Sequence, residues 1–347
     1  MTTYNFDVLG ACRESKVEHF SRVGGVARMA ILVGIDEAGF GPLLGPLVVS
    51  STTFSLPSHL LKSDLWAILR KSLSRSRKRL AGRLLVTDSK KAFSKSLGIH
   101  HLQRTVLASL QCLGYEPATS AELMGLLCPD DLERLNDYPW YKDAGSRSLS
   151  VNRADRDIAS SVLTENLASN NMKLLDMKSY CLDVAYYNEM VAAIKNKANV
   201  LFSTTSRLIK RAYDHFSMDD LQLIIDRQGG RIRYRKHLQQ LFDGLELRIL
   251  HESPKTSSYE LHANDRRMRI HFVVGADERF LPVSLASMVS KYLRELQIGN
   301  INRYFTGFSD DLKPTAGYWK DGLRFIEELQ TNLPHIKFNN TQLIRSR

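Results

Sequence analysis

Acidic residues follow apolar runs at three places in this chain. Asp36 and Glu37 come directly after the run at 31–35, and Asp226 ends the run at 221–225. Asp277 follows a third apolar run and precedes a helical pattern. A carboxylate at the end of a core strand is costly unless something compensates its charge. These four side chains are therefore candidates for one functional site, if the fold brings the strand ends together.

Glycines and prolines surround the first acidic pair, in the sequence GIDEAGFGPLLGP from 34 to 46. This composition indicates a backbone that adopts special conformations or that a ligand approaches closely. Asp36 and Glu37 point to opposite sides of an extended strand, so both reach one ligand only if the chain bends. Gly39 and Gly41 permit that bend. For an Asp-Glu pair taken alone, two solvated turn residues remain the alternative.

Four converging carboxylates repel one another unless divalent cations neutralise them. Hard oxygen ligands favour Mg²⁺ or Mn²⁺, and two such ions about 3.5–4 Å apart support in-line displacement at a phosphodiester. The chain has 48 Lys and Arg against 37 Asp and Glu, a net charge of +11, which favours a polyanionic partner. Together these features predict a nuclease with a two-ion site. The predicted catalytic residues and metal ligands are Asp36, Glu37, Asp226 and Asp277.

The elements that must position these acids alternate between strands and helices. We expect strands at 31–35, 47–54, 173–184 and 221–225, the first two forming a hairpin. We expect helices at 63–83, 94–113, 153–167, 199–215 and 281–296. This alternation indicates an α/β fold with a mixed sheet flanked by helices.

Composition divides the chain into five expected parts. They are an N-terminal extension at 1–30, a first core part at 31–114, a helical insertion or subdomain at 115–171, a second core part at 172–302 and a C-terminal helical segment at 303–347. Met29 is an alternative start of the chain. The first thirty residues contain no signal peptide pattern, and the four cysteines have no zinc-site spacing. We therefore expect a cytoplasmic protein with reduced cysteines and no membrane partner.

Basic residues gather in three places. A dense cluster at 70–83 includes Arg77, Lys78 and Arg79, which we expect to bind nucleic acid; a solvated helix face is the alternative. A set at 231–235 has alternate spacing and, on a strand, shares one face. A further set at 266–269 precedes Asp277, and we expect both smaller sets to surround the acidic site.

Four blocks of the sequence resemble the type 2 ribonuclease H family, ribonuclease HII, and occur in family order. They are GIDEAGFGPLLGPLVV at 34–49, VTDSKKAF at 86–93, LIIDRQGG at 223–230 and ADERFLPVSLASMVSKYLRE at 276–295. The resemblance covers 31–113 and 172–330. It implies a ribonuclease H-like fold and cleavage of the RNA strand of RNA/DNA hybrids, ribonucleotides embedded in DNA included. It also implies that the four acids bind the metal and that Lys90, Lys91 and Lys291 contact backbone phosphates.

The chain departs from the family pattern in three ways. Gly39-Phe40-Gly41 stands where the family has Gly-Arg-Gly, whose main chain reads the ribose 2′-hydroxyl; both glycines remain, so this backbone is still expected to bind nucleic acid. Lys313 replaces a Tyr before Pro-Thr. Tyr318 and Trp319 are candidates to replace that ring, with packing of the final helix against the core as the alternative. The segments at 115–170 and 250–269 make the chain longer than the simple bacterial form.

We therefore expect a monomeric, Mg²⁺- or Mn²⁺-dependent endoribonuclease that acts on RNA/DNA hybrids or on ribonucleotide-containing DNA duplexes, leaving 5′-phosphate and 3′-hydroxyl ends. Two alternatives stay open. One is a nuclease of the same superfold that acts on another structure, such as branched DNA. The other is a non-catalytic hybrid-binding paralogue, which the four retained acids disfavour because their repulsion stabilises nothing without a metal.

Overall fold

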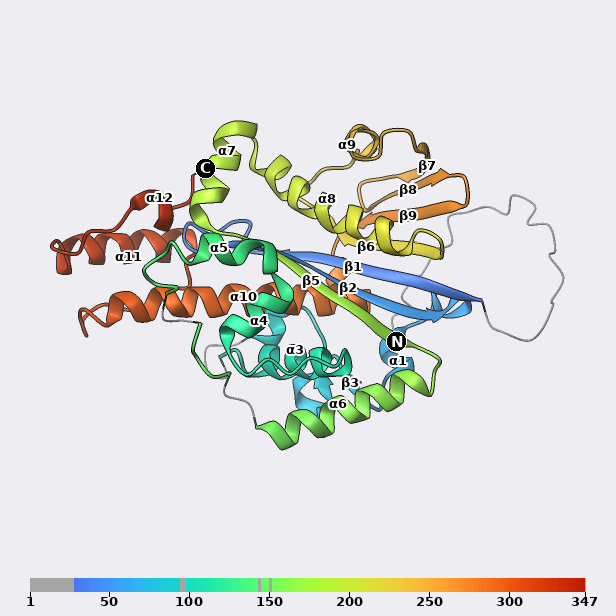
Figure 1. Cartoon of the computed structure of the whole chain (residues 1–347), viewed down its shortest axis with the longest axis horizontal. Helices are drawn as coiled ribbons and strands as arrows, with labels where there is room; N and C mark the ends of the chain where they lie inside the picture. Colours follow the sequence, from blue (N-terminus) through green and yellow to red (C-terminus); the bar gives the residue numbers. More distant parts are fainter. Residues whose placement is uncertain (1–27, 94–97, 143–144, 150–151, 347) are drawn as a thin grey trace.

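A seven-stranded mixed sheet forms the centre of the protein (Figure 1). The structure, a computed structural model, describes residues 28–93, 98–142, 145–149 and 152–346. The strand order is β5-β2-β1-β6-β9-β8-β7. The strands are β1 (Met29–Ala38), β2 (Leu47–Pro57), β5 (Lys173–Leu182), β6 (Asp220–Asp226), β7 (Glu246–Glu252), β8 (Thr256–Ala263) and β9 (Arg266–Val273). The expected mixed sheet is confirmed.

The three central strands run in the same direction. β1 pairs in parallel with β6, and β6 pairs in parallel with β9. β2 forms the expected antiparallel hairpin with β1, and β5 continues this side of the sheet. β8 and β7 extend the other side as antiparallel strands, so the stretch at 250–269 does contain a hairpin. The carboxyl ends of β1, β6 and β9 therefore meet at one edge of the sheet.

Helices cover both faces of the sheet (Figure 1). On one face lie α3 (His100–Cys112), α6 (Arg153–Ala168) and α10 (Leu281–Thr306). On the other face lie α7 (Val184–Ile194), α8 (Lys197–Phe216) and α9 (Arg235–Leu241). Each face has its own apolar core. The helices expected at 153–167, 199–215 and 281–296 are confirmed, as is the described part of the one at 94–113.

The helix α10 packs unusually closely on β1. A Cβ added to Gly34 would lie 2.2 Å from the backbone of Pro282 and Val283, so only glycine lets the first turn of α10 rest on the strand. The Thr52 hydroxyl of β2 donates to the Pro282 carbonyl at 2.8 Å. This contact places α10 directly behind the carboxyl half of β1.

The remaining helices join the α10 face. They are α2 (Ser89–Ala92), α4 (Ser120–Leu127), α5 (Leu132–Leu135), α11 (Trp319–Asn332) and α12 (Asn340–Leu343), with short 3₁₀ turns at Ser58–Leu60, Pro129–Asp131 and Ala276–Glu278. Buried residues of the 115–171 segment and of the C-terminal segment lie in the same apolar cluster as α3 and α10. The division of the chain into parts at these boundaries stays a prediction.

The helix expected at 63–83 is wrong. The structure has a short α1 (Leu65–Ile68), then β3 (Leu73–Ser74), a 3₁₀ turn (Arg77–Arg79) and β4 (Leu84–Leu85). β3 pairs with β4 in parallel, and the Trp66 indole donates to the Val86 carbonyl at 2.8 Å. These contacts fold the segment back on itself, and such long-range pairing overrides the helical spacing of its apolar residues.

Two further expectations concern cysteines and membranes. Cys112, Cys128 and Cys181 are free thiols. No helix in the described part of the chain is long and apolar enough to cross a membrane. Cys12 and nearly all of the expected N-terminal extension lie outside the described residues.

Candidate metal and nucleic-acid site

Asp36 and Glu37 lie near the carboxyl end of β1, which pairs with a strand on each side. Asp36 is buried, and its Oδ1 accepts the Glu37 backbone N–H at 2.8 Å. The Asp36 carbonyl accepts the Ser290 hydroxyl of α10 at 3.0 Å, and that hydroxyl also contacts the Ser50 hydroxyl of β2 at 2.8 Å. The strand and the helix behind it thus hold the first acid in a fixed place.

One hydrogen bond ties Asp226 to the turn that carries Asp277. Asp226 ends β6, next to β1, and its Oδ1 accepts the Ala276 backbone N–H at 2.7 Å. Ala276 begins the 3₁₀ turn that carries Asp277. Gly275 precedes this turn with φ +62°, a conformation that glycine adopts readily. The turn after β9 is therefore folded back onto the end of β6.

Burial and neighbouring charges raise the pKa values of all four carboxylates. Burial, followed by the charges of Glu37, Asp226 and Asp277, raises the pKa of Asp36 well above its usual range. Burial and the Asp226 charge raise the pKa of Glu37 to about 8. Burial raises the pKa of Asp226 to about 6, although the Ala276 N–H opposes the shift. Burial first, and then neighbouring acids, raise the pKa of Asp277.

Two residues at this site were not among the predicted site residues. Asp88 caps α2 by accepting the Lys90 N–H at 2.9 Å, and its charge raises the pKa of Asp277. The Ser287 hydroxyl of α10 lowers the pKa of Asp36 and donates to Ser89 at 3.1 Å. Asp88 lies inside the sequence block at 86–93 and Ser287 inside the block at 276–295. A carboxylate directly before a short helix was the available signal for Asp88.

The donor chemistry of this site fits a hard divalent cation. All four candidate ligands are carboxylates, and Glu37 Oε2 is buried without a hydrogen-bond partner among the described residues. A buried carboxylate oxygen in this state lacks the partner that a cation supplies. Within the described ranges, however, no three His, Cys, Asp or Glu side chains are grouped closely enough to make a complete metal site. The residues fit the metal, while their side chains do not form a closed coordination shell.

The three predicted phosphate-binding lysines have different surroundings. Lys90 is exposed, and its charge lowers the pKa values of Glu37, Asp226 and Asp277, so it lies close to the acids. Lys91 pairs with Glu278 at 2.6 Å. Lys291 is buried and pairs with Glu295 at 2.6 Å. Of the three, Lys90 alone forms no ion pair with the described residues.

The loop Gly39-Phe40-Gly41 follows the first acidic pair. Gly39 has φ +95°, and a Cβ there would lie 2.5 Å from the Pro46 carbonyl oxygen and 2.9 Å from Arg294 Cδ. This position therefore accepts only glycine. Phe40 is half-buried, with Lys197 Nζ 5.5 Å from its ring centre, and Gly41 is exposed. The main chain of the loop reaches the surface beside Glu37.

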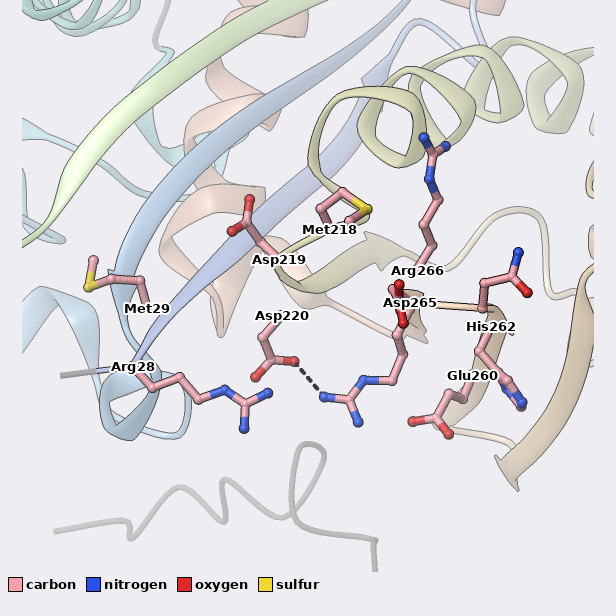
Figure 2. Close-up of a pocket in the computed structure, with 11 residues that line it drawn as sticks. Arg28, Met29, Met218, Asp219, Asp220, Glu260, His262, Asp265 and Arg266 are labelled. Atoms are coloured by element: carbon pink, nitrogen blue, oxygen red, sulfur yellow. Dashed lines mark hydrogen bonds and ion pairs between the residues drawn. The ribbon is translucent and has the colours of Figure 1, made fainter. Parts of the chain in front are cut away.

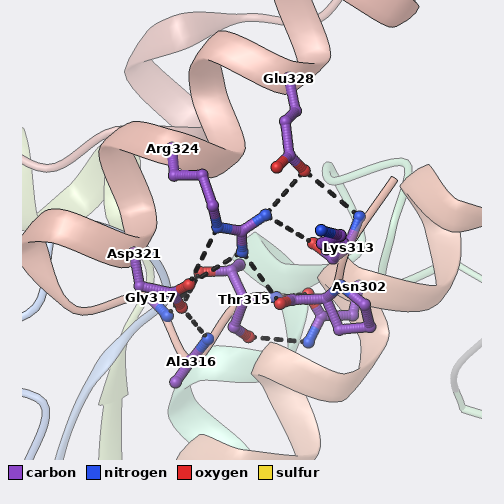
Figure 3. Close-up of polar contacts among 9 residues, drawn as sticks. Asn302, Lys313, Thr315, Ala316, Gly317, Asp321, Arg324 and Glu328 are labelled. Atoms are coloured by element: carbon purple, nitrogen blue, oxygen red, sulfur yellow. Dashed lines mark hydrogen bonds and ion pairs between the residues drawn. The ribbon is translucent and has the colours of Figure 1, made fainter. Parts of the chain in front are cut away.

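A polar network shapes the loop that contains Lys313 (Figure 3). The Lys313 main chain donates to Glu328 at 3.3 Å and accepts from Arg324 at 3.2 Å, while Thr315 donates to Asp321 at 2.7 Å. Tyr318 and Trp319 follow this loop in the chain and are 49% and 38% exposed. Both rings are partly exposed, and the choice between replacing the family's Tyr and packing the final helix against the core stays a prediction. The Tyr318 ring centre lies 5.9 Å from Lys291 Nζ.

The other basic residues lie apart from the acids or are already engaged. Arg77, in the 3₁₀ turn with Lys78 and Arg79, lies beside α3, where its charge lowers the pKa of His101. The 231–235 set does not lie on a strand, so its alternate spacing does not place it on one face: 231–234 is irregular, and Arg235 begins α9.

The 266–269 set lies at the amino end of β9, the end opposite the acids, so the expectation that it surrounds the site is wrong. Arg267 pairs there with Asp220 at 3.5 Å. Arg266 and Asp220 line a separate cavity of about 570 Å³ (Figure 2).

Comparisons with known proteins point to one class of solved structures. No family model and no curated protein matches the sequence. The PCNA:RNase HII complex from Archaeoglobus fulgidus is similar at 16% identity, over 91% of this chain and 94% of that chain, with a TM-score of 0.42. Ribonuclease H2 from Pyrococcus horikoshii OT3 is similar at 14% identity, over 90% and 92%, with a TM-score of 0.38. Bst-RNase HIII in complex with Mn²⁺ is similar at 13% identity, over 92% and 66%, with a TM-score of 0.41. These solved structures are ribonucleases of types HII, H2 and HIII, the class that the four sequence blocks also resemble.

Proposed function

We propose that this protein is a divalent-metal-dependent endonuclease that hydrolyses the RNA strand of RNA/DNA hybrids. The observation that carries the proposal is the group of four carboxylates at the carboxyl ends of β1, β6 and β9. The charges of Glu37, Asp226 and Asp277 raise the pKa of Asp36, and one buried oxygen of Glu37 has no partner among the described residues. Such a group destabilises the fold unless cations occupy it.

Asp36, Glu37, Asp226 and Asp277 would hold Mg²⁺ or Mn²⁺. When bound, such ions supply an activated water and stabilise charge on the leaving oxygen. The protein's own part is to hold the four oxygen donors in place. The Ser290 hydroxyl fixes the main chain at Asp36, and the Ala276 N–H fixes the Asp226 carboxylate.

Residues around the acids suit the binding of a nucleic-acid backbone. Lys90 is exposed beside the acids and is the lysine best placed for a phosphate next to the cleaved bond. The main chain of Gly39-Phe40-Gly41 offers hydrogen-bond groups for a ribose 2′-hydroxyl, as in the family that the sequence resembles. The exposure of the Tyr318 ring supports a role for it in stacking on a sugar or base, in place of the Tyr that Lys313 replaces. We extend the proposal to ribonucleotides embedded in DNA on this basis.

A cleavage assay with purified protein tests the function. The substrates are an RNA/DNA hybrid, a DNA duplex with one ribonucleotide, duplex RNA and a branched DNA junction, each with Mg²⁺, Mn²⁺ or EDTA. We expect metal-dependent cleavage of the first two, with 5′-phosphate products. If only the branched DNA junction is cleaved, the substrate is branched DNA and not the RNA/DNA hybrid. Metal-independent binding of hybrid without cleavage would show a non-catalytic binding protein.

We also propose that the protein acts as a monomer in the cytoplasm. The free thiols of Cys112, Cys128 and Cys181 are consistent with a reducing compartment. Sedimentation of the purified protein with and without hybrid tests the monomer, and a dimer mass would contradict it.

A further inference from the structure

A cavity of about 300 Å³ adjoins the Gly39-Phe40-Gly41 loop, of which Phe40 and Gly41 line it. Aromatic and basic side chains from five separate parts of the chain line it: Phe40, Tyr187, Lys197, Trp319 and Arg345. None of the described residues that line it is acidic. The cavity is therefore positively charged, with aromatic walls, and it adjoins the loop that follows the first two acids.

Arg345 is the unusual residue of this cavity. Its side chain is 4% exposed and lies flat against Tyr187, with the guanidinium carbon 3.8 Å from the ring centre. Nη1 donates to the Gly39 carbonyl, and the Arg345 backbone N–H donates to the Leu43 carbonyl at 2.9 Å. These contacts fix the guanidinium relative to the loop.

Two nitrogens of Arg345 are left over. Nε and Nη2 are buried and have no hydrogen-bond partner among the described residues, and Arg345 forms no ion pair with them. These two nitrogens make up one edge of the guanidinium, the edge that binds two oxygens of a phosphate or carboxylate side by side. A buried cation with an open bidentate edge is strongly destabilising unless an anion binds there.

Lys197 supplies a second positive charge. It is the first residue of α8, is exposed, and holds Nζ 5.5 Å from the Phe40 ring centre. It forms no ion pair within the described residues, so its charge is available to a ligand. A free phosphate carries up to two negative charges, and a phosphodiester carries one negative charge spread over two oxygens. Either group matches a site that has a bidentate arginine and a nearby lysine.

We propose that this cavity is a phosphate-binding subsite, in which Arg345 holds a phosphate of the nucleic-acid strand and Lys197 contributes a second charge. The inference rests on the proposed function for the identity of the strand, but the cavity itself does not depend on the metal. Because Arg345 also holds the Gly39 carbonyl, a phosphate bound there is linked to the loop two residues from Glu37. The subsite would set the register of the strand relative to the acids.

The test measures binding without catalysis. Affinity for a labelled RNA/DNA hybrid is determined in EDTA at a series of salt concentrations, for the unchanged protein and for Arg345→Met, Arg345→Lys, Lys197→Met and Lys210→Met. Lys210 is the matched control, because it lies exposed on the same helix and pairs with Asp214 outside the cavity. A variant that no longer binds one phosphate shows a slope of log affinity against log salt that is smaller by about 0.9.

We expect this smaller slope for Arg345→Met and Lys197→Met and no change for Lys210→Met. Arg345→Lys should keep the slope but bind more weakly, because one ammonium cannot replace the bidentate edge. Thermal melting checks that each variant folds, and the exposed Lys197→Met variant keeps the test valid if Arg345→Met does not.

A second arm titrates inorganic phosphate and follows tryptophan fluorescence, since Trp319 lines the cavity. An Arg345-dependent response to phosphate with unchanged hybrid slopes would assign the cavity to free phosphate and overturn the nucleic-acid assignment. Unchanged slopes and no response would overturn the subsite altogether. Neither arm of the test uses metal or measures cleavage. The phosphate subsite can therefore be confirmed in a protein that cleaves nothing, or overturned in an active nuclease.

Discussion

Acidic residues have opposite surroundings at the two ends of the parallel strands β1, β6 and β9. At the amino ends, Asp220 pairs with Arg267 at 3.5 Å, and Glu260 of the adjacent β8 pairs with Arg269 at 2.7 Å. At the carboxyl ends, the acids form no ion pair within the described residues, and burial and neighbouring acids raise the pKa values of Asp36 and Asp226. Paired acids at a strand end are ordinary surface electrostatics. Unpaired, buried acids that repel one another indicate a site kept for a ligand, so the surroundings and not the residue type separate function from structure.

The largest contrast between the two ends is in catalysis. Asp36→Asn removes one metal ligand while keeping the shape of the side chain, and we expect hybrid cleavage to fall by roughly 10³-fold or more. Asp220→Asn, at the other end of the neighbouring strand, should leave cleavage nearly unchanged. Initial rates with Mg²⁺ measure both. Full activity of Asp36→Asn would remove the carboxyl ends from consideration as the active site.

The second contrast concerns the helix that supports the carboxyl ends. Gly34→Ala places a methyl group 2.2 Å from the α10 backbone and should lower the free energy of unfolding by about 3 kcal/mol. Gly299 lies within α10 itself, and a Cβ added there meets no atom within 4 Å. Gly299→Ala should therefore raise the free energy of unfolding by about 0.5–1 kcal/mol. Denaturant titrations give both values. Equal stability of the two variants would mean that α10 does not rest on β1 at Gly34.

The pH dependence of stability should come from the carboxyl ends. Folding raises the pKa of Glu37 from 4.5 to about 8, so the folded protein binds more protons than the unfolded chain between these values. The metal-free protein is therefore most stable below about pH 4.5 with respect to this group, and loses that contribution as pH rises towards 8. Melting temperatures in EDTA from pH 5 to 8.5 should fall for the unchanged protein.

Glu37→Gln is the control for this prediction. It should melt at a temperature that falls less with pH, while Asp220→Asn, at the amino ends, should follow the unchanged protein. Added Mg²⁺ should raise the melting temperature more at pH 8 than at pH 6, because cations and protons compete for the same oxygens. An identical pH profile for Glu37→Gln would show that Glu37 does not titrate in this range.

The smallest expected effect concerns the basic residues. Reversal of the charges of Arg77, Lys78 and Arg79 should weaken hybrid binding and lower the salt slope by about 0.9 for each phosphate that the variant no longer binds. Reversal of Arg266 and Arg267, at the amino ends, should leave the slope unchanged, although it breaks the ion pair with Asp220. Fluorescence anisotropy of a labelled hybrid at several salt concentrations measures the slope for each variant. Equal slopes for both variants would make the 70–83 cluster a solvated surface.

Local patterns predicted much of the fold. The β1–β2 hairpin, β5, β6 and the helices α6, α8 and α10 all follow from apolar periodicity with glycine and proline at the turns. The prediction of a helix at 63–83 was wrong because Trp66 forms a hydrogen bond with Val86 and β3 pairs with β4, contacts between residues too far apart for a helix turn. The predicted position of the 266–269 arginines was wrong for a related reason. Strand β9 separates them from Asp277 and carries the chain to the opposite end of the sheet, so closeness in sequence did not mean closeness in space.

The sequence by itself determined which residue types were available at the candidate site. Acids that end apolar runs, glycines beside them and the four blocks in order were readable without coordinates. Only the tertiary structure decided which of these groups are compensated. It paired Lys91 with Glu278, left Lys90 beside the acids, exposed Tyr318 and enclosed Arg345 with an open edge. Charge compensation depends on distance and burial between residues far apart in the chain, and no local pattern records either quantity.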